Sequence, residues 1–131
     1  MPRQIIHTDN APAAVGTYSQ AVKVSTDAGS TVYMSGQIGL DPKTMVMREG
    51  FAAQAVQVMD NIEAVVKAAG GTLADVVKFN VFLTDLNDFA ALNELFVARL
   101  PKPYPARSAV QVAALPKDAV VEIETILFIE D

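Results

Sequence analysis

The sequence predicts an α+β fold in which two helices pack on one face of a mixed β-sheet. Segments with strand-like patterns and two segments with helical periodicity follow one another in the order β-β-β-α-β-α-β-β, which is typical of a sheet covered by helices. No repeat, low-complexity tract or linker-like charge run divides the 131 residues, half of which are hydrophobic. We therefore expect one domain over residues 1–131 with a core of its own.

Three short strands are expected in the first third of the chain. Residues 3–8 and 19–25 have strand-like composition, and the turn-prone segment 9–18 separates them. Residues 30–40 form a stronger strand, which two glycines and the turn sequence DPKT bring to an end.

Two helices are expected, over residues 51–71 and 86–100. In the first, apolar residues recur at intervals of three and four, and Gly70 and Gly71 end it as a C-cap would. The second has an apolar stripe that consists of Phe89, Leu92, Phe96 and Leu100.

The remaining strands are expected over residues 76–85, 106–115 and 119–130. The first alternates apolar and polar residues, as a strand with one buried face does. The other two are joined by a short turn, which favours a simple hairpin, and residues 108–115 have the composition of a buried strand. A second sheet face, with Phe82, Ile126 and Phe128, is too apolar to remain in water, so we expect other copies of the chain to cover it.

The composition excludes several kinds of chemistry. The chain has no cysteine and only one histidine, His7, which excludes thiolate nucleophiles, cysteine-bound metals and most histidine-dependent triads. Acid–base chemistry must then come from carboxylates, tyrosine or water, and neither a metal nor a cofactor is expected. A net charge of −5 argues against nucleic-acid binding. No apolar run has the length of a signal peptide or a membrane span, so a cytoplasmic protein that does not bind membranes is expected.

Arg107 is the most informative residue that departs from its local pattern. It lies at the start of a strand whose composition predicts burial. A guanidinium cannot lose its charge, so a partly buried one needs an anion. Two kinds of anion could be the partner of Arg107. One is an acid of the chain itself, Glu122 or Glu124; the other is a substrate carboxylate, which the guanidinium can bind with two parallel hydrogen bonds.

Asn93 and Glu122 also depart from their surroundings. Asn93 falls within the apolar stripe of the second helix, either as a structural amide that ties the helix to a neighbouring backbone or as part of a site. Glu122 shares a strand face with Glu124, Ile126 and Phe128. Burial there would raise the pKa of its carboxyl group towards neutrality; alternatively, the two acids are solvated and protect an edge strand.

Two further positions have both a structural and a functional interpretation. The Ser35–Gly36 pair in the middle of a strand indicates a bulge or a close approach, by a ligand or by an adjacent subunit, to Gly36. Tyr18 lies between a turn and a strand, where an aromatic residue with a polar tip is more often a packing residue than a catalytic one.

Five stretches together resemble the RidA/YjgF family of small imine deaminases, which are also called endoribonuclease L-PSP or translation-inhibitor proteins. These stretches are GTYSQAV, YMSGQIGLDP, AAGGTLADVVKFNVFLTD, NDFAALNE and PARSAVQVAALPKDAVVEIE. The resemblance covers almost the whole chain. The last stretch is the most specific, because the family couples a Pro-Ala-Arg-Ser strand to a hydrophobic-Glu-Ile strand at this separation.

The resemblance implies a chorismate-mutase-like fold and a homotrimer whose sheets line a central β-barrel, with active sites between subunits. In members that act on 2-imino acids, the arginine matching Arg107 holds the substrate carboxylate. The other matching pocket residues are Tyr18, Ser35, Gly36, Asn93 and Glu122. Many members have cysteine two residues after the arginine, where this chain has Ala109. A mechanism that needs a thiol is therefore ruled out, and we expect Ala109 to contribute backbone atoms to substrate binding.

The implied reaction is the hydrolysis of 2-iminobutanoate, 2-iminopropanoate and related enamines such as 2-aminoacrylate to 2-keto acids and ammonia, without a cofactor. We expect Arg107 to hold the carboxylate, Glu122 to orient water and shuttle a proton, and Tyr18 to close the pocket. Asn93 would hold Arg107 or the pocket backbone in place. A simple hairpin, however, places Glu122 nearer Gln111 than Arg107, which leaves a gap that the long arginine side chain, a register irregularity or a neighbouring subunit must span.

Two other functions remain open at this point. The same pocket could bind a 2-keto acid or another small carboxylate without turnover, as a sensor or a chaperone-like protein, and Arg107 suits that role equally well. A ribonuclease is less compatible with the acidic charge and the absence of a catalytic histidine pair.

Overall fold

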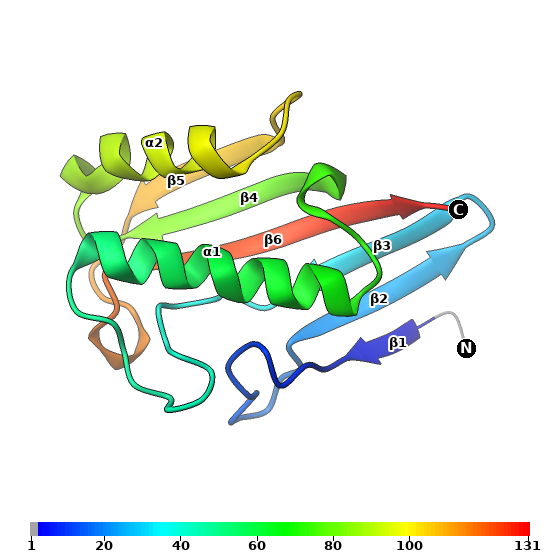
Figure 1. Cartoon of the computed structure of the whole chain (residues 1–131), viewed down its shortest axis with the longest axis horizontal. Helices are drawn as coiled ribbons and strands as arrows, with labels where there is room; N and C mark the ends of the chain where they lie inside the picture. The colour runs from blue at the N-terminus through cyan, green and yellow to red at the C-terminus, as the bar shows by residue number, and fades with distance from the viewer. Residues whose placement is uncertain (1–2) are drawn as a thin grey trace.

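The computed structural model describes residues 3–131, which form one six-stranded sheet in the order β1-β2-β3-β6-β4-β5 and two α-helices (Figure 1). The strands are β1 Arg3–Ile6, β2 Ala21–Thr26, β3 Gly29–Met34, β4 Val76–Leu83, β5 Ala106–Gln111 and β6 Val121–Glu130. The helices are α1 Phe51–Ala68 and α2 Phe89–Arg99, and short 3₁₀ turns occur at Leu73–Asp75, Leu86–Asp88 and Pro116–Asp118.

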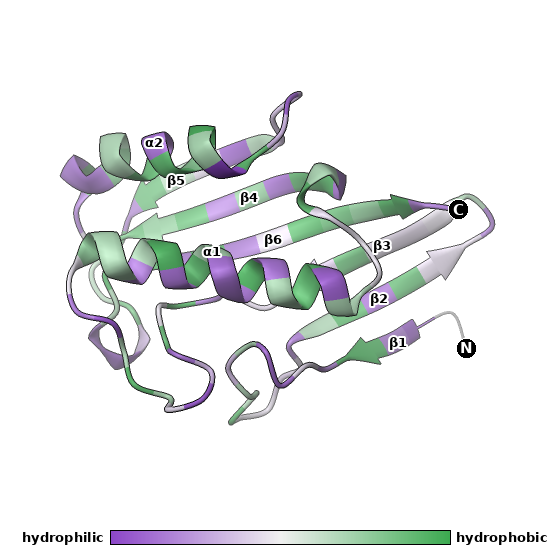
Figure 2. Cartoon of the chain, viewed as in Figure 1, coloured by the Kyte–Doolittle hydropathy of each residue, from purple (hydrophilic) through white to green (hydrophobic). Residues whose placement is uncertain are grey.

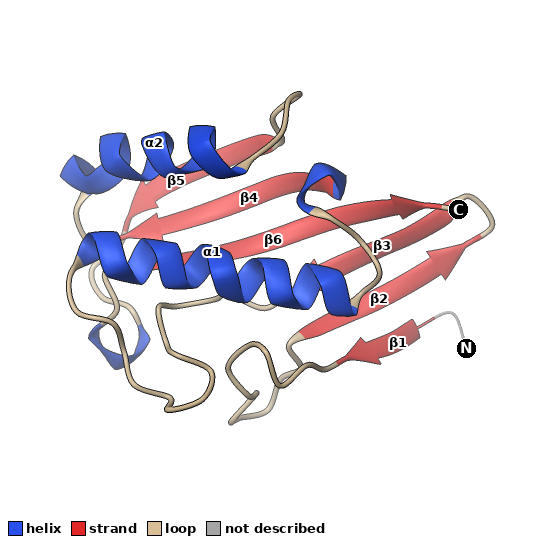
Figure 3. Cartoon of the chain, viewed as in Figure 1, coloured by secondary structure: helices blue, strands red, loops and turns tan. Residues whose placement is uncertain are grey.

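Both helices lie on the same face of the sheet, as the sequence predicts (Figure 3). The core lies between the two layers, and its largest fully buried side chains come from both, including Met59, Ile62 and Leu92 of the helices and Phe79, Leu83 and Ile123 of the sheet. The periodic apolar residues of the helices are thus the ones that contact the sheet. No helix within residues 3–131 combines the length and the apolar character that crossing a bilayer requires.

The C-terminus of α1 confirms the cap predicted from the two glycines. Gly70 has a φ of 94°, a conformation that glycine adopts without steric cost. Its N–H donates to the Lys67 carbonyl, and the N–H of Gly71 donates to the Val66 carbonyl, each over 3.0 Å. This pair of hydrogen bonds is the Schellman motif, which satisfies the last carbonyls of the helix.

The expected hairpin between the last two strands is wrong, because β4 lies between them. β4 pairs in parallel with β5 on one side and antiparallel with β6 on the other. β6 therefore occupies the middle of the sheet, between β3 and β4. Its alternate residues Val121, Ile123 and Leu127 are fully buried, and a strand with so apolar a face is best placed where it has neighbours on both sides.

β5 is an edge strand, and the expectation that it is buried is also wrong. Most of its residues are exposed in the single chain, including the apolar Val110 at 46%. Its apolar composition predicted burial, but β5 has a strand neighbour on one side only. An exposed apolar edge of this kind is suited to contact with another chain.

The strand expected over residues 30–40 ends at Met34, and a bulge follows. Tyr33 pairs with Ile126, whereas the next pairing joins Gln37 to Ile123. Three residues, 34–36, thus face two residues, 124–125, so the segment that contains Ser35 and Gly36 has one extra residue relative to β6. A bulge is one of the two alternatives that the sequence left open at this position.

The sheet face opposite the helices is partly apolar, as expected. Hydrophobic segments run along β4 and β6 (Figure 2). On the uncovered face Phe82, Ile126 and Phe128 are only half-buried, and the ring of Tyr33 is 52% exposed.

Candidate active site

Arg107 extends from β5 onto the face of the sheet that the helices cover. Its pairing partner in β4 is Phe79, whose side chain is fully buried beneath the helices. The Arg107 guanidinium carbon lies 4.7 Å from the ring centre of Phe89 and 5.9 Å from that of Phe96. Its Nη1 donates a hydrogen bond of 2.9 Å to Oδ1 of Asn93. Two rings and one amide therefore orient the guanidinium without neutralising it.

No acid forms an ion pair with Arg107 in the part of the chain that the structure describes. Neither Glu122 nor Glu124 contacts it, so an internal salt bridge does not explain this arginine. The residue is exposed, not partly buried as the sequence suggested. It borders a groove of about 350 Å³ between α2 and β5, which Phe79, Asn93, Phe96, Val97, Leu100, Tyr104 and Pro105 also line.

Asn93 is exposed on α2 and does not belong to the buried stripe, which includes Leu92, Phe96 and Leu100. The expectation of an amide within an apolar stripe is thus wrong. α2 packs over the edge of the sheet, so the flank of the helix above β5 remains open. Asn93 holds a side chain, that of Arg107, and not a neighbouring backbone.

Glu122 lies on the opposite face of the sheet, where its pairing partner is Phe82. It borders a second cavity, of about 490 Å³. Burial raises the pKa of its carboxyl group, and repulsion from Glu124 raises it further. The raised pKa agrees with the predicted apolar surroundings, whereas the alternative of two acids protecting an edge is wrong because β6 is central.

Gly36 makes room for the Glu122 side chain. A Cβ atom at Gly36 would overlap Oε2 of Glu122. The group that comes close to Gly36 within the described chain is thus its own carboxylate, whereas the sequence suggested a ligand or an adjacent subunit. The backbone here is fixed by Ser35, whose N–H donates to the Gln20 carbonyl over 3.0 Å and whose Oγ donates to the Ser19 carbonyl over 2.6 Å.

Tyr18 and Ala109 occupy different positions relative to this cavity. Tyr18 lines it, is 52% exposed, and accepts a hydrogen bond of 3.4 Å from the Val15 N–H at its hydroxyl oxygen. Ala109 pairs with Val81 in β4, and its methyl group packs against the core. Its side chain lines neither cavity.

The predicted site residues therefore form two half-sites within one chain. Arg107 and Asn93 border the groove on the helix-covered side, whereas Tyr18, Ser35, Gly36 and Glu122 border the second cavity. The two cavities share no lining residue. The gap expected between Arg107 and Glu122 is thus real, and its cause is β4, which separates their strands.

Sequence reasoning missed part of the second cavity, which Ile38, Leu40, Met45, Pro116 and Lys117 also line. The turn sequence DPKT was the one available signal for these residues, because it predicts a turn directly after the strand that contains Gly36. Within residues 3–131 no three His, Asp or Glu side chains converge closely enough to hold a metal ion.

Comparison with known proteins identifies the family. The family model described as Endoribonuclease L-PSP matches residues 8–129, nearly the whole described chain. The chain belongs to this family, which includes the RidA/YjgF proteins. RidA from the Antarctic bacterium Psychrobacter sp. PAMC 21119 has a crystal structure that is 71% identical in sequence, with a TM-score of 0.91 over 96% of this chain and 99% of that one.

Two other members of the family inform the function. The 2-iminobutanoate/2-iminopropanoate deaminase of Salmonella typhimurium is 51% identical over 92% of this chain and 94% of its own length. The crystal structure of Escherichia coli TdcF with bound serine is 42% identical, with a TM-score of 0.86 over 97% of this chain and 99% of that one.

Proposed function

We propose that this protein is a 2-imino acid deaminase, which hydrolyses 2-iminobutanoate, 2-iminopropanoate and related enamines to 2-keto acids and ammonia without a cofactor. A Salmonella relative with half of its residues identical bears the name of this activity. The TdcF neighbour binds serine, a small molecule with a carboxylate next to an amine-bearing carbon, as a 2-imino acid has next to its imine.

The observation that carries the proposal is Arg107, an oriented guanidinium with no acid partner in the described chain. Such a group is ready to bind a carboxylate through two parallel hydrogen bonds. Asn93 accepts from one nitrogen only, so donors remain for a substrate. The aromatic rings of Phe89 and Phe96, whose centres lie 4.7 and 5.9 Å from the guanidinium carbon, limit its orientations.

The complete site forms between subunits of a homotrimer in this proposal, with Arg107 from one subunit and Glu122 from its neighbour. Two features support the assembly. The sheet face opposite the helices exposes apolar side chains such as Tyr33, and β5 is an uncovered apolar edge. Three sheets that associate through such surfaces would line a central barrel and bring together the two half-sites of adjacent chains.

The chemistry requires orientation more than a strong base. Water adds its oxygen to the carbon of the protonated C=N group and gives up one proton, and a carbinolamine forms. The nitrogen takes up that proton and the C–N bond breaks, so that ammonia leaves. The carbinolamine hydroxyl releases its proton to the solvent as the carbon becomes the carbonyl of the 2-keto acid. The raised pKa of Glu122 suits a carboxyl group that orients this water and carries the proton. Tyr18, at the rim of the same cavity, would limit access of bulk water.

The experiment measures ammonia release by the full-length protein from imines that a threonine dehydratase generates in the same solution. Arg107→Ala should lower the protein-dependent rate by at least about a hundredfold, because the carboxylate is no longer oriented. Lys67→Ala is the matched control, since Lys67 is an exposed cation on α1 that lines neither cavity, and it should leave the rate unchanged.

Three results would overturn the proposal. An Arg107→Ala protein with full activity would show that the guanidinium does not hold the substrate. Release of at most one equivalent of ammonia per site would show that the protein is a carboxylate-binding protein without turnover. RNA cleavage that co-purifies with the protein, survives chelation and occurs without any imine hydrolysis would favour the ribonuclease.

A further inference from the structure

The cavity beside Glu122 has a wall that none of the predicted site residues explains. Residues 38–48 form this wall as a small hairpin, closed by the isolated bridge between Leu40 and Met47. Ile38, Leu40 and Met45 of this hairpin line the cavity, together with Ser35, Gly36 and Glu122. The hairpin therefore contributes three apolar residues to a cavity whose lining also contains the carboxyl group of Glu122.

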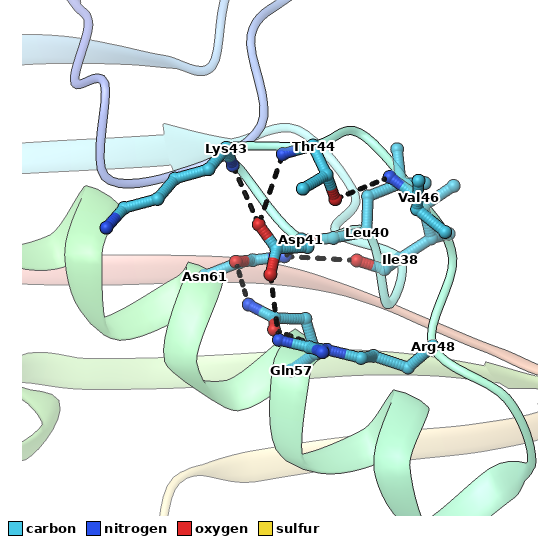
Figure 4. A network of polar contacts seen from close by, with 9 residues as sticks. All are labelled: Ile38, Leu40, Asp41, Lys43, Thr44, Val46, Arg48, Gln57 and Asn61. Atoms are coloured by element: carbon cyan, nitrogen blue, oxygen red, sulfur yellow. Dashed lines mark hydrogen bonds and ion pairs between the residues drawn. The ribbon is translucent and has the colours of Figure 1, made fainter.

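The hairpin is held firmly by a buried polar network (Figure 4). Asn61 of α1, which is fully buried, donates from Nδ2 to the carbonyls of Ile38 and Leu40 over 3.2 and 3.0 Å. Gln57 donates to Oδ1 of Asn61 over 2.8 Å, and Arg48 Nε donates to Oε1 of Gln57 over 3.1 Å. Buried amides are costly unless they are satisfied, so this chain of hydrogen bonds fixes the position of the hairpin against α1.

Asp41 fixes the tip of the same hairpin. Its Oδ1 accepts hydrogen bonds from the N–H groups of Lys43 and Thr44, and its Oδ2 accepts one of 2.8 Å from Nη2 of Arg48 (Figure 4). These hydrogen bonds and the charge of Arg48 hold the pKa of Asp41 below its ordinary value, with the N–H of Lys43 as the largest cause. The carboxylate thus organises the turn that presents Met45.

Met45 adopts a backbone conformation that disfavours a side chain. Its φ is 59°, in the left-handed region where glycine is preferred. Within residues 3–131 the other non-glycine residues with positive φ are Lys117 and Asp118, and Lys117 lines the same cavity. Strained residues of this kind cluster at functional sites, which points to a use for the Met45 side chain that glycine could not supply.

We propose that Met45 is a specificity-determining residue, whose side chain contacts the apolar side chain of the substrate; this inference rests on the proposed function. With the carboxylate on Arg107 and the imine near Glu122, the third substituent of the reacting carbon would lie against the apolar residues that the hairpin adds to the cavity lining. Leu40 is buried in the protein, whereas Ile38 and Met45 are both half-exposed. Ile38 lies at the base of the hairpin, where Asn61 holds its carbonyl, and Met45 lies at the tip. Its flexible thioether side chain suits contact with ligand chains of different length. The preference is therefore for unbranched or γ-branched apolar chains over the methyl group of 2-iminopropanoate.

The test compares full-length wild-type protein with Met45→Gly, Met45→Leu and Val46→Ala. The imines are generated in solution from alanine, 2-aminobutanoate and leucine by an amino-acid oxidase, and ammonia release gives kcat/KM for each. Met45→Gly should lower the ratio of kcat/KM for the leucine-derived imine to that for the alanine-derived imine about tenfold. Met45→Leu should largely keep the ratio. Val46, on the same hairpin but 62% exposed and not in the cavity lining, provides the control, and its variant should match the wild type.

Calorimetric binding of the corresponding 2-keto acids provides a readout that does not depend on turnover. Wild-type affinity should increase with chain length, and Met45→Gly should abolish that increase. If the wild type binds in this way but hydrolyses no imine, the proposed reaction fails and the role of Met45 stands. If imines are hydrolysed and Met45→Gly changes kcat/KM equally for all of them, or for none, the proposed role of Met45 is wrong and the proposed reaction stands. If the wild type neither hydrolyses the imines nor binds the keto acids, both are wrong.

Discussion

Arg107 and Glu122 lie on strands that flank the same strand, β4, yet their side chains are on opposite faces of the sheet. The pairing partner of Arg107 is Phe79, on the helix-covered face, and that of Glu122 is Phe82, on the uncovered face. A backbone layer therefore separates the two groups within one chain. If they act on one substrate, each must come from a different subunit.

Asn93 is expected to act through Arg107. Asn93→Ala removes the hydrogen bond to Nη1 and should raise KM for a 2-imino acid roughly tenfold, with a smaller change in kcat, because the guanidinium loses part of its orientation. Steady-state kinetics measures both constants. Glu94→Ala, at the neighbouring exposed position of α2, should behave as wild type. An Asn93→Ala protein with unchanged KM would show that the amide does not position Arg107.

The stability of the folded chain should depend on pH through Glu122. Its pKa is raised above the ordinary value of 4.5, first by burial and then by Glu124. The folded chain therefore binds this proton more tightly than the unfolded chain does. The stabilisation from the protonated form is complete below pH 4.5 and is lost as the pH rises through the raised pKa.

Urea unfolding of wild type and Glu122→Gln at several pH values tests this dependence. The difference in unfolding free energy between the two proteins isolates the contribution of Glu122 from those of other groups. One such group is Asp41, whose lowered pKa makes its contribution to stability increase with pH. The variant should gain in stability relative to wild type as the pH rises above 4.5. A difference that does not change with pH would mean that the pKa of Glu122 is not raised.

Gly36→Ala should displace the Glu122 carboxylate, because the new Cβ would overlap its Oε2. The side chain can rotate away at a cost of at most about 1.5 kcal/mol in the free energy of unfolding. We expect a larger effect on imine hydrolysis, of at least about tenfold, since the water-orienting group has moved.

A double-variant comparison identifies the cause of that loss. Adding Gly36→Ala to a Glu122→Ala protein should cost no further stability, because the overlapping side chain is already absent. If Gly36→Ala lowers the free energy of unfolding equally in the wild type and in the Glu122→Ala protein, the new Cβ atom overlaps a group other than the Glu122 side chain.

Local structure was largely predictable from the sequence, whereas the order of the strands was not. The apolar repeat of α1 and the two glycines after it predict the helix and its cap because both depend on neighbouring residues. The hairpin error between β5 and β6 has a different origin, since strand pairing depends on contacts distant in sequence. The segment β4–α2–β5 has the order of a β-α-β unit, whose strands are usually parallel neighbours. That order was the available signal for the observed pairing.

The candidate site was predictable where a residue type conflicts with its surroundings. Arg107 and Glu122 introduce charge into apolar strands, and Gly36 interrupts a strand. The division into two half-sites was not predictable, because it depends on which neighbour each strand has. Met45 was missed for another reason: the residue type does not predict a positive φ at a residue other than glycine.

Subunit complementation tests the shared site most directly. Arg107→Ala and Glu122→Gln proteins, each inactive alone, are unfolded together in equal amounts and refolded, and the trimer fraction is assayed for ammonia release. If one subunit contributes Arg107 and its neighbour Glu122, about one of the three sites in each mixed trimer regains both groups. This is roughly a quarter of all sites in the randomly assembled trimer fraction, and activity should return to about that fraction of wild type. Mixed trimers without activity would contradict the account, since they would place both groups in the site of a single chain.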